Sequence, residues 1–408
     1  MQTQLSPEFK DTAAGREAEA ILRKCVHCGF CTATCPTYQV FGDELDGPRG
    51  RIYLIKQVLE GETPTEKTQL HLDRCLTCRN CESTCPSGVQ YGHLVDIGRQ
   101  IVEERVPRSL GDRALRWALK EGLPSPLFAL AMKLGQSVRA LLPAALKAKV
   151  PAPRDAGAWP AREHPRKMLM LAGCVQPAMA PNINTATARV LDAAGVQVVV
   201  APAAGCCGAV KFHLNDQVGG KAQMRANIDA WWPYVEGGQV EAIVMNASGC
   251  GVTVKEYGHL LKDDAAYAGK ARRISELARD LSELLPMLVP ALRDRVKPDG
   301  ATLAYHPPCT LQHGQQLRGG VERHLGELGF HVRVASNESH LCCGSAGTYS
   351  VLQPETAEQL RDRKLGHLGQ LQPAAIVSAN IGCITHLQSG TDTPVRHWVE
   401  VLDAAIAP

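Results

Sequence analysis

The chain has 408 residues, 45% of them hydrophobic, and its 44 Lys and Arg against 41 Asp and Glu give a formal net charge of +3. This length predicts about two or three soluble domains, and no apolar run reaches the roughly 18 residues of a membrane-spanning helix. The small net charge, without basic residues interleaved with aromatic ones, argues against nucleic-acid binding.

The N-terminal segment is polar and predicts neither a secretion signal nor a twin-arginine leader. We therefore expect a cytoplasmic protein, whose thiols are kept reduced. In that compartment the sixteen cysteines indicate metal binding instead of disulfides.

The first eight cysteines lie in two copies of one motif. CVHCGFCTATCP, which starts at Cys25, and CLTCRNCESTCP, which starts at Cys75, both have the spacing C-x2-C-x2-C-x3-C-P. This run binds [4Fe–4S] clusters, and its fourth cysteine ligates the other cluster of the pair. The expected ligands are therefore Cys25, Cys28, Cys31 and Cys85 for cluster 1, and Cys75, Cys78, Cys81 and Cys35 for cluster 2.

A pair of zinc sites is the alternative for these cysteines, but zinc explains neither the third cysteine nor the proline of each copy. Between the motifs, GPRGRIYLIKQVLEG has a helical pattern. We therefore expect residues 1–104 to form a helical ferredoxin domain with two [4Fe–4S] clusters, unlike the compact β-rich bacterial ferredoxins.

Residues 105–166 contain no cysteine and are rich in Ala, Leu and Pro, with more basic than acidic residues. Apolar residues recur at helical spacing in RSLGDRALRWALKEG and LFALAMKLGQSVRALL, which predicts a basic helical linker. The stretch 123–150 suits either the surface of an anionic membrane or packing against a partner subunit or the chain's own domains. The packing interpretation is the simpler one.

The other eight cysteines belong to an internal repeat with an offset of about 135 residues. LMLAGC, which ends at Cys174, matches LAYHPPC, which ends at Cys309. The segment 205–208 (GCCG) matches 341–344 (LCCG), and 242–250 (AIVMNASGC) matches 375–383 (AIVSANIGC). Continuous apolar runs such as VQVVVAP predict buried parallel strands, so we expect two duplicated α/β units with parallel sheets, at 167–298 and 299–408.

Each unit has its cysteines in the order C…CC…C, and each cysteine follows a predicted strand. Ligand sites of open parallel sheets lie at such strand ends. Two adjacent cysteines point in different directions, and the glycine after them lets another group approach the backbone. The expected metal ligands are Cys174, Cys206, Cys207 and Cys250 in site 1, and Cys309, Cys342, Cys343 and Cys383 in site 2.

The order and the CCG signature resemble the cysteine-rich CCG domains of heterodisulfide reductases and of respiratory dehydrogenase subunits. With the double cluster motif in front, nearly the whole chain resembles the iron–sulfur subunits of bacterial glycolate oxidase (glycolate dehydrogenase). The broader CCG pattern ends in C-x-x-C, whereas here the missing cysteines fall at Ala247 and Asn380, or at Thr253 and His386 if the pair is read forwards. Four thiolates remain in each unit, enough for a further [4Fe–4S] cluster or a zinc ion.

No motif for binding a flavin or a nicotinamide is present, and no catalytic residue is expected. Because oxidation of a 2-hydroxy acid normally passes a hydride to a flavin, the flavin must lie on another subunit. The resemblance implies flavin-containing partners that convert glycolate to glyoxylate, a quinone as acceptor, and a peripheral position on the inner face of the cell membrane.

Three alternatives stay open at this stage. The chain could serve a lactate or glycerol-3-phosphate dehydrogenase, act as a thiol/disulfide reductase of the heterodisulfide type, or be a zinc-stabilised scaffold. His306 and His340, close to the cysteines of site 2, could tune a cluster by hydrogen bonding to its sulfur or simply cap strand ends.

Overall fold

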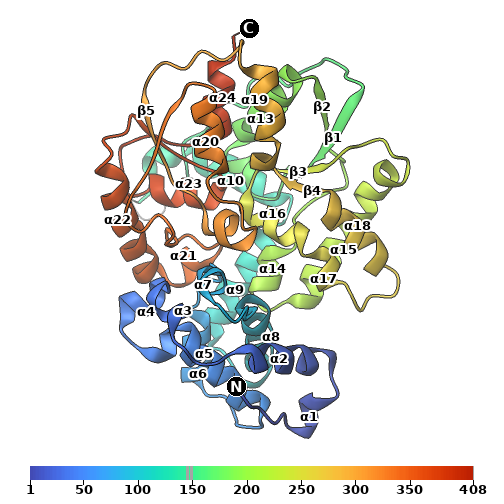
Figure 1. The fold of residues 1–408 in the computed structure, drawn as a ribbon, viewed down its shortest axis with the longest axis vertical. Helices are drawn as coiled ribbons and strands as arrows, with labels where there is room; N and C mark the ends of the chain where they lie inside the picture. Colours follow the sequence, from blue (N-terminus) through green and yellow to red (C-terminus); the bar gives the residue numbers. More distant parts are fainter. Residues whose placement is uncertain (144–146, 148–149, 408) are drawn as a thin grey trace.

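The computed structural model describes residues 1–143, 147 and 150–407. The N-terminal helices lie at one end of the molecule, and two α/β units lie side by side at the other (Figure 1). Both the helical N-terminal part and the two parallel sheets predicted from the sequence are confirmed.

The N-terminal part is built from short helices around one apolar core. Pro48 begins α5, where its missing N–H costs nothing. Gly98 of α8 lets this helix approach α5, because a Cβ atom there would lie 2.5 Å from Cγ1 of Ile55. The helices are α1 (Pro7–Lys10), α2 (Ala13–Lys24), α3 (Phe30–Ala33), α4 (Pro36–Phe41), η1 (Glu44–Asp46), α5 (Pro48–Leu59), α6 (Glu66–Asp73), α7 (Asn80–Thr84) and α8 (Tyr91–Arg105).

The predicted helical linker contains α9 (Leu110–Gly122), α10 (Leu127–Ser137) and η2 (Arg139–Leu141). Arg108 and Arg116 both pair with Asp73 of α6, at 2.7 and 3.0 Å. At the far end of α9, Glu121 pairs with Lys211 of the first α/β unit at 2.8 Å. Ion pairs therefore connect α9 both to the N-terminal helices and to the first α/β unit. Residues 144–146 and 148–149 of the expected linker lie outside the described residues.

Each α/β unit has one four-stranded, all-parallel sheet, and the strand orders β2-β1-β3-β4 and β6-β5-β7-β8 are equivalent. The fourth strand of each sheet is missed by the sequence pattern because its residues, Ala-Arg-Asp in one sheet and Val-Arg-His in the other, include charged or polar side chains and give no apolar run. The strands are β1 (Arg166–Met170), β2 (Val196–Val199), β3 (Ile243–Met245), β4 (Ala278–Asp280), β5 (Thr302–Tyr305), β6 (His331–Val334), β7 (Ala375–Ser378) and β8 (Val395–His397).

The two units share one apolar core, and the first unit has a second core of its own on the other face of its sheet. Buried apolar residues of both sheets belong to one cluster, and Arg189 of α13 holds Asp403 of α24 with bonds of 2.9 and 3.1 Å. The remaining helices are α12 (Gln176–Met179), α13 (Pro181–Ala193), α14 (Ala209–His213), α15 (Gln217–Glu236), α16 (Ser248–Lys255), α17 (Tyr257–Leu260), α18 (Ala268–Leu277), η3 (Leu281–Leu284), α19 (Leu285–Leu292), η4 (Thr310–Gly314), α20 (Gly320–Glu327), α21 (Tyr349–Leu352), α22 (Pro354–Gly369), α23 (Ile381–Gln388) and α24 (Trp398–Ala405).

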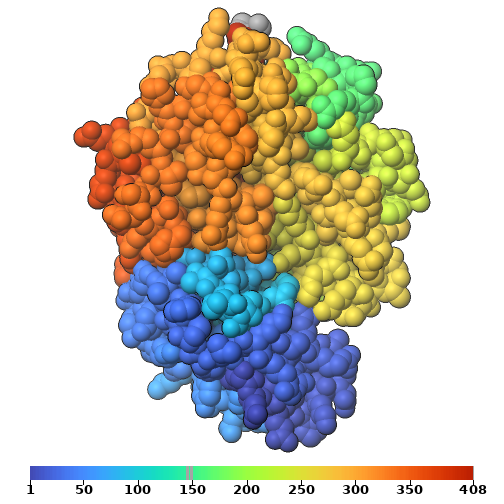
Figure 2. All heavy atoms as spheres, viewed as in Figure 1, coloured from blue at the N-terminus to red at the C-terminus, as the bar shows by residue number. Residues whose placement is uncertain are grey.

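The N-terminal helices pack directly against both units, and their surfaces meet without a gap in the face that Figure 2 shows. Arg79 forms an ion pair with Glu256 of the first unit. Ser83 contacts Nδ1 of His313 in the second unit at 2.7 Å, and Asn80 donates to the carbonyl oxygen of His340. The second cluster motif therefore contacts both units.

Candidate metal centres

The two N-terminal motifs fold into the same turn. In each, the second residue after the first cysteine and the residue after the second cysteine have positive φ: His27 and Gly29 in one copy, Thr77 and Arg79 in the other. Such turns direct successive backbone N–H groups into a concave space that favours anions. Three of these four residues are not glycine, and a positive φ costs them free energy. Both motifs nevertheless adopt this conformation and form the same turn.

Between these turns lie two hollows lined by cysteines. The first, of about 440 Å³ including its open mouth, is lined by all four cysteines expected for cluster 1 and also by Cys81. The second, of about 310 Å³, is lined by the four cysteines expected for cluster 2. Cys35 caps α4, and the proline after it begins that helix, which places the fourth cysteine of the first motif beside the second hollow. Thiolate donors around two hollows fit two [4Fe–4S] clusters.

The two hollows differ in exposure. Cys28 is exposed, and beside it the side chains of Val26 and Phe30 are 67% and 60% exposed. In the second hollow Cys35, Cys75 and Cys81 are buried. One centre is therefore accessible to a partner, and the other lies inside the molecule.

Burial favours the protonated form of three thiols in the two hollows when no metal is bound. It raises the pKa of Cys31 to about 11, and it raises the pKa values of Cys78 and Cys81 well above their usual range. Metals bind the thiolate, so loading the hollows must release protons, and the binding energy adds to folding stability.

A buried ionic network supports the second hollow. Asp46, fully buried, accepts bonds from Arg51 at 3.3 Å and Arg74 at 2.9 Å, and lies 3.1 Å from Nδ1 of His71. Arg51 also lines the hollow. Although burial opposes its charge, Cys75, Tyr91 and the other groups facing it raise the pKa of Arg51, so a permanent cation stands beside the thiolates.

In the α/β units every cysteine follows the carboxyl end of a strand, as predicted. In the first unit hydrogen bonds link the four thiols of site 1 into a chain, from Cys174 through Cys206 and Cys207 to Cys250. Bonds from Cys174 and Cys207 lower the pKa of Cys206 to about 3. Site 1 therefore brings all its predicted ligands together.

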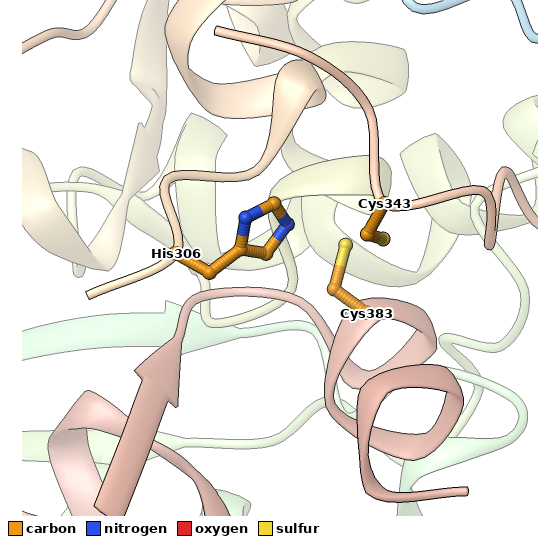
Figure 3. A group of neighbouring side chains, drawn as sticks. All are labelled: His306, Cys343 and Cys383. Atoms are coloured by element: carbon orange, nitrogen blue, oxygen red, sulfur yellow. The ribbon is translucent and has the colours of Figure 1, made fainter. Parts of the chain in front are cut away.

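Site 2 is assembled in the same way, and Cys309 donates to Cys342 with their sulfurs 3.7 Å apart. Cys343 and Cys383 lie next to His306, and one donor atom from each of the three residues lies within 4.8 Å of the others (Figure 3). The hydrogen bond to Cys342 and burial raise the pKa of Cys309 well above its usual range.

The glycine of each CCG motif has a steric role that the sequence pattern only suggested. Gly208 and Gly344 have φ of 94° and 91°. A Cβ atom at Gly344 would lie 2.4 Å from the carbonyl oxygen of Ala357, and one at Gly208 would lie 2.7 Å from that of Gly220. Only glycine lets α15 and α22 approach the CCG turns this closely.

The positions of the missing fifth cysteines carry no thiolate substitute. Asn380 donates to Sγ of Cys383 at 3.8 Å and accepts from the backbone N–H of Gly249 at 3.3 Å, so it joins site 2 to the residue before Cys250. At the alternative position His386, Nε2 lies 3.0 Å from the carbonyl oxygen of Ala357. Each site therefore offers four thiolates, not five.

Site 2 also touches the second N-terminal hollow. Leu76 packs with Cys309, Cys342 and Tyr349 in one apolar cluster, against which Cys78 also packs. This contact joins residues more than two hundred positions apart. Sequence patterns also missed His313, whose Nε2 lies 2.8 Å from the carbonyl oxygen of His340, because only the fold brings it to the interface.

Family models match the parts of the chain that carry these centres. The model of a 4Fe-4S dicluster domain matches residues 21–89, and the model of a cysteine-rich domain, CCG, matches residues 168–255 and 303–388. Fold and donors therefore define an iron–sulfur protein with two [4Fe–4S] clusters and two cysteine-rich domains.

Similar proteins give a narrower classification. The chain is 57% identical to the glycolate oxidase iron-sulfur subunit of Escherichia coli K12, over 100% of this chain and 99% of that protein. It is 31% identical to the probable glycolate oxidase iron-sulfur subunit of Bacillus subtilis 168, over 95% and 92%. The lactate utilization protein A of Bacillus licheniformis is 25% identical over 58% of this chain. The chain belongs to the family of glycolate oxidase iron–sulfur subunits.

Proposed function

We propose that this chain is the electron-transfer subunit of a flavin-dependent complex that oxidises glycolate to glyoxylate. The carrying observation is the contact that places Cys78 of the second hollow against Cys309 and Cys342 of site 2. When bound, the clusters carry electrons one at a time. The flavin of the partner subunit accepts the hydride from glycolate. A quinone is the proposed final acceptor, and the family resemblance is its only support.

The arrangement of the hollows supports a route through the chain. The exposed surface at Cys28, Val26 and Phe30 gives one end of the route access to a partner. The buried hollow follows, and site 2 lies directly behind it. Site 1 lies beside site 2 across Asn380 and Gly249.

Glycolate is the preferred substrate of the complex because the chain aligns over its full length with glycolate oxidase subunits, whereas the lactate utilization protein A matches over 58% of it. Four thiolates in place of five argue against chemistry on a disulfide in sites 1 and 2. We infer that these sites hold further [4Fe–4S] clusters.

Metal analysis tests the cofactors of sites 1 and 2. Anaerobically purified protein is expected to contain about twelve to sixteen irons per chain, with matching acid-labile sulfide. About eight irons with one or two zinc ions would instead make the N-terminal pair the only carriers and the α/β units structural. Chemical analysis of iron, sulfide and zinc gives the answer directly.

An exposed apolar face on α9 and α10 is the proposed docking surface for the flavin-containing subunits. Leu127, Leu130 and Leu134 are 67–70% exposed and recur on one side of α10, and Trp117 of α9 is 65% exposed. Such a face costs free energy in water and marks an interface. No helix in the described part of the chain is long and apolar enough to cross a membrane.

Purification through a tag on this chain is expected to recover flavin-containing subunits, and glycolate should bleach the iron–sulfur absorption of the complex. The substitution Leu130→Asp places a charge in the docking face and should release the flavin-containing subunits. The matched control is Val218→Asp, because Val218 is 79% exposed and lies on a different helix, α15.

Three outcomes would contradict these expectations. Bleaching by lactate or glycerol-3-phosphate in place of glycolate would reassign the substrate. Equal recovery of partners with both variants would move the docking surface elsewhere. Loss of binding to anionic lipid vesicles in Leu130→Asp, with the complex intact, would assign the face to the membrane.

A further inference from the structure

Site 2 contains a buried histidine, His306, whose backbone bonds to β7 while its ring bonds to no described residue. The side chain of His306 follows β5 and is 1% exposed. Neither ring nitrogen has a hydrogen-bond partner among the described residues. Leaving a buried polar group unpaired costs free energy, so the ring points to a partner that the described residues do not supply.

The ring faces two cysteine sulfurs. In Figure 3 one nitrogen of His306 is directed toward the sulfur atoms of Cys343 and Cys383, and the three donor atoms lie within 4.8 Å of one another. Cys343 and Cys383 are themselves 1% and 4% exposed. Imidazole and thiolate donors that converge in a dry space form a typical site for a transition metal.

The first unit lacks this nitrogen donor. Three residues before Cys309 the second unit has His306, whereas three residues before Cys174 the first unit has Leu171. Leu171 is 3% exposed and packs in the apolar core of its unit. The two sites therefore have equivalent sets of four thiols, and at this position one repeat has a potential ligand where the other has a hydrocarbon.

We propose that His306 is a nitrogen ligand of the metal centre in site 2, and that site 1 has thiolate ligands only. The inference rests on the proposed function in one respect, which is that the metal is the iron of a cluster. With His306 as one of the four ligands, one of the four thiols of site 2 stays unbound, and a neutral nitrogen ligand in place of a thiolate raises the reduction potential of a cluster. Site 2 would then be the better electron acceptor of the two repeats.

The test uses the complete protein in its native form. Wild-type protein labelled with ¹⁵N-histidine is reduced, and its electron spin echo spectrum is compared with that of unlabelled protein. A directly bound imidazole nitrogen is expected to change its coupling on labelling. Because this measurement needs no mutation, it does not depend on whether a variant folds.

The variant His306→Leu, which copies the first repeat, assigns the signal and should lose this coupling. The control His340→Leu changes another histidine near the same cysteines and should retain it. Iron and zinc are measured on each sample. If the α/β units contain iron but the wild type shows no histidine coupling, His306 is not a ligand. The proposed electron-transfer function of the chain would not be affected by that result.

Zinc in site 2 would refute the proposal that this site holds an iron–sulfur cluster. X-ray absorption at the zinc edge would then show whether His306 binds the zinc ion. One nitrogen neighbour that is lost in His306→Leu supports the ligation, and four sulfur neighbours alone refute it. A protein with about eight irons and no zinc refutes both statements together.

Discussion

Replacing Cys78 by serine is expected to remove cluster 2 and to abolish electron transfer from the flavin to an external acceptor. Cys78 lines the second hollow and also packs against the apolar cluster that contains Cys309 and Cys342. Its loss therefore interrupts the proposed route where the N-terminal domain meets site 2. The expected iron content falls by about four per chain, and the rate of acceptor reduction with glycolate falls to background.

The matched control is Cys207→Ala in site 1, which lies beside site 2 and not between it and the second hollow. If that variant keeps most of the wild-type rate while Cys78→Ser loses it, site 1 stands outside the route. Cys343→Ala tests site 2 in the same way. Wild-type rates in Cys78→Ser, in a complex that still assembles, would refute the relay.

The substitution Asp46→Asn is expected to destabilise the N-terminal domain strongly. It removes the charge that balances Arg51, which is 1% exposed, while the neighbouring Arg74 stays in place. Leaving a buried charge without its partner costs about 3–5 kcal/mol. For a domain of this size, that loss corresponds to a fall of about 10 °C or more in the unfolding midpoint.

Thermal unfolding of the anaerobic protein, followed by circular dichroism and by release of iron, measures this effect. The control is Glu44→Gln, which breaks a half-exposed pair with Arg49 of 2.6 Å and should cost less than about 1 kcal/mol. Equal falls in the unfolding midpoint of both variants would show that the network around Asp46 stabilises the domain no more than an exposed ion pair does.

The pattern of the sequence was sufficient for the architecture because the signals are local. The C-x2-C-x2-C-x3-C-P runs indicated the two cluster motifs, and the repeat of strands and cysteines indicated two equivalent sheets. The strands β4 and β8 were missed, because Ala-Arg-Asp and Val-Arg-His contain charged or polar residues and so form no apolar run. The ligand assignments and domain limits stay predictions until metals and fragments are measured.

Long-range contacts could not be predicted in this way. The contact of Cys78 with site 2 joins two domains, and no spacing rule describes it. The environment of His306 was also hidden, since the sequence allowed it to be a strand cap or a hydrogen-bond donor to sulfur. Its ring bonds to no described residue, and only the fold revealed that it faces Cys343 and Cys383.

The open mouth of the first hollow has a practical consequence for the separated chain. Cys28 is exposed there and Cys31 and Cys85 are partly so, so dioxygen and chelators reach this centre before any other. Air damage should therefore begin at one known corner of the molecule and proceed inward. A subunit that covers this corner would act as its shield, which makes assembly itself a form of protection against oxidation.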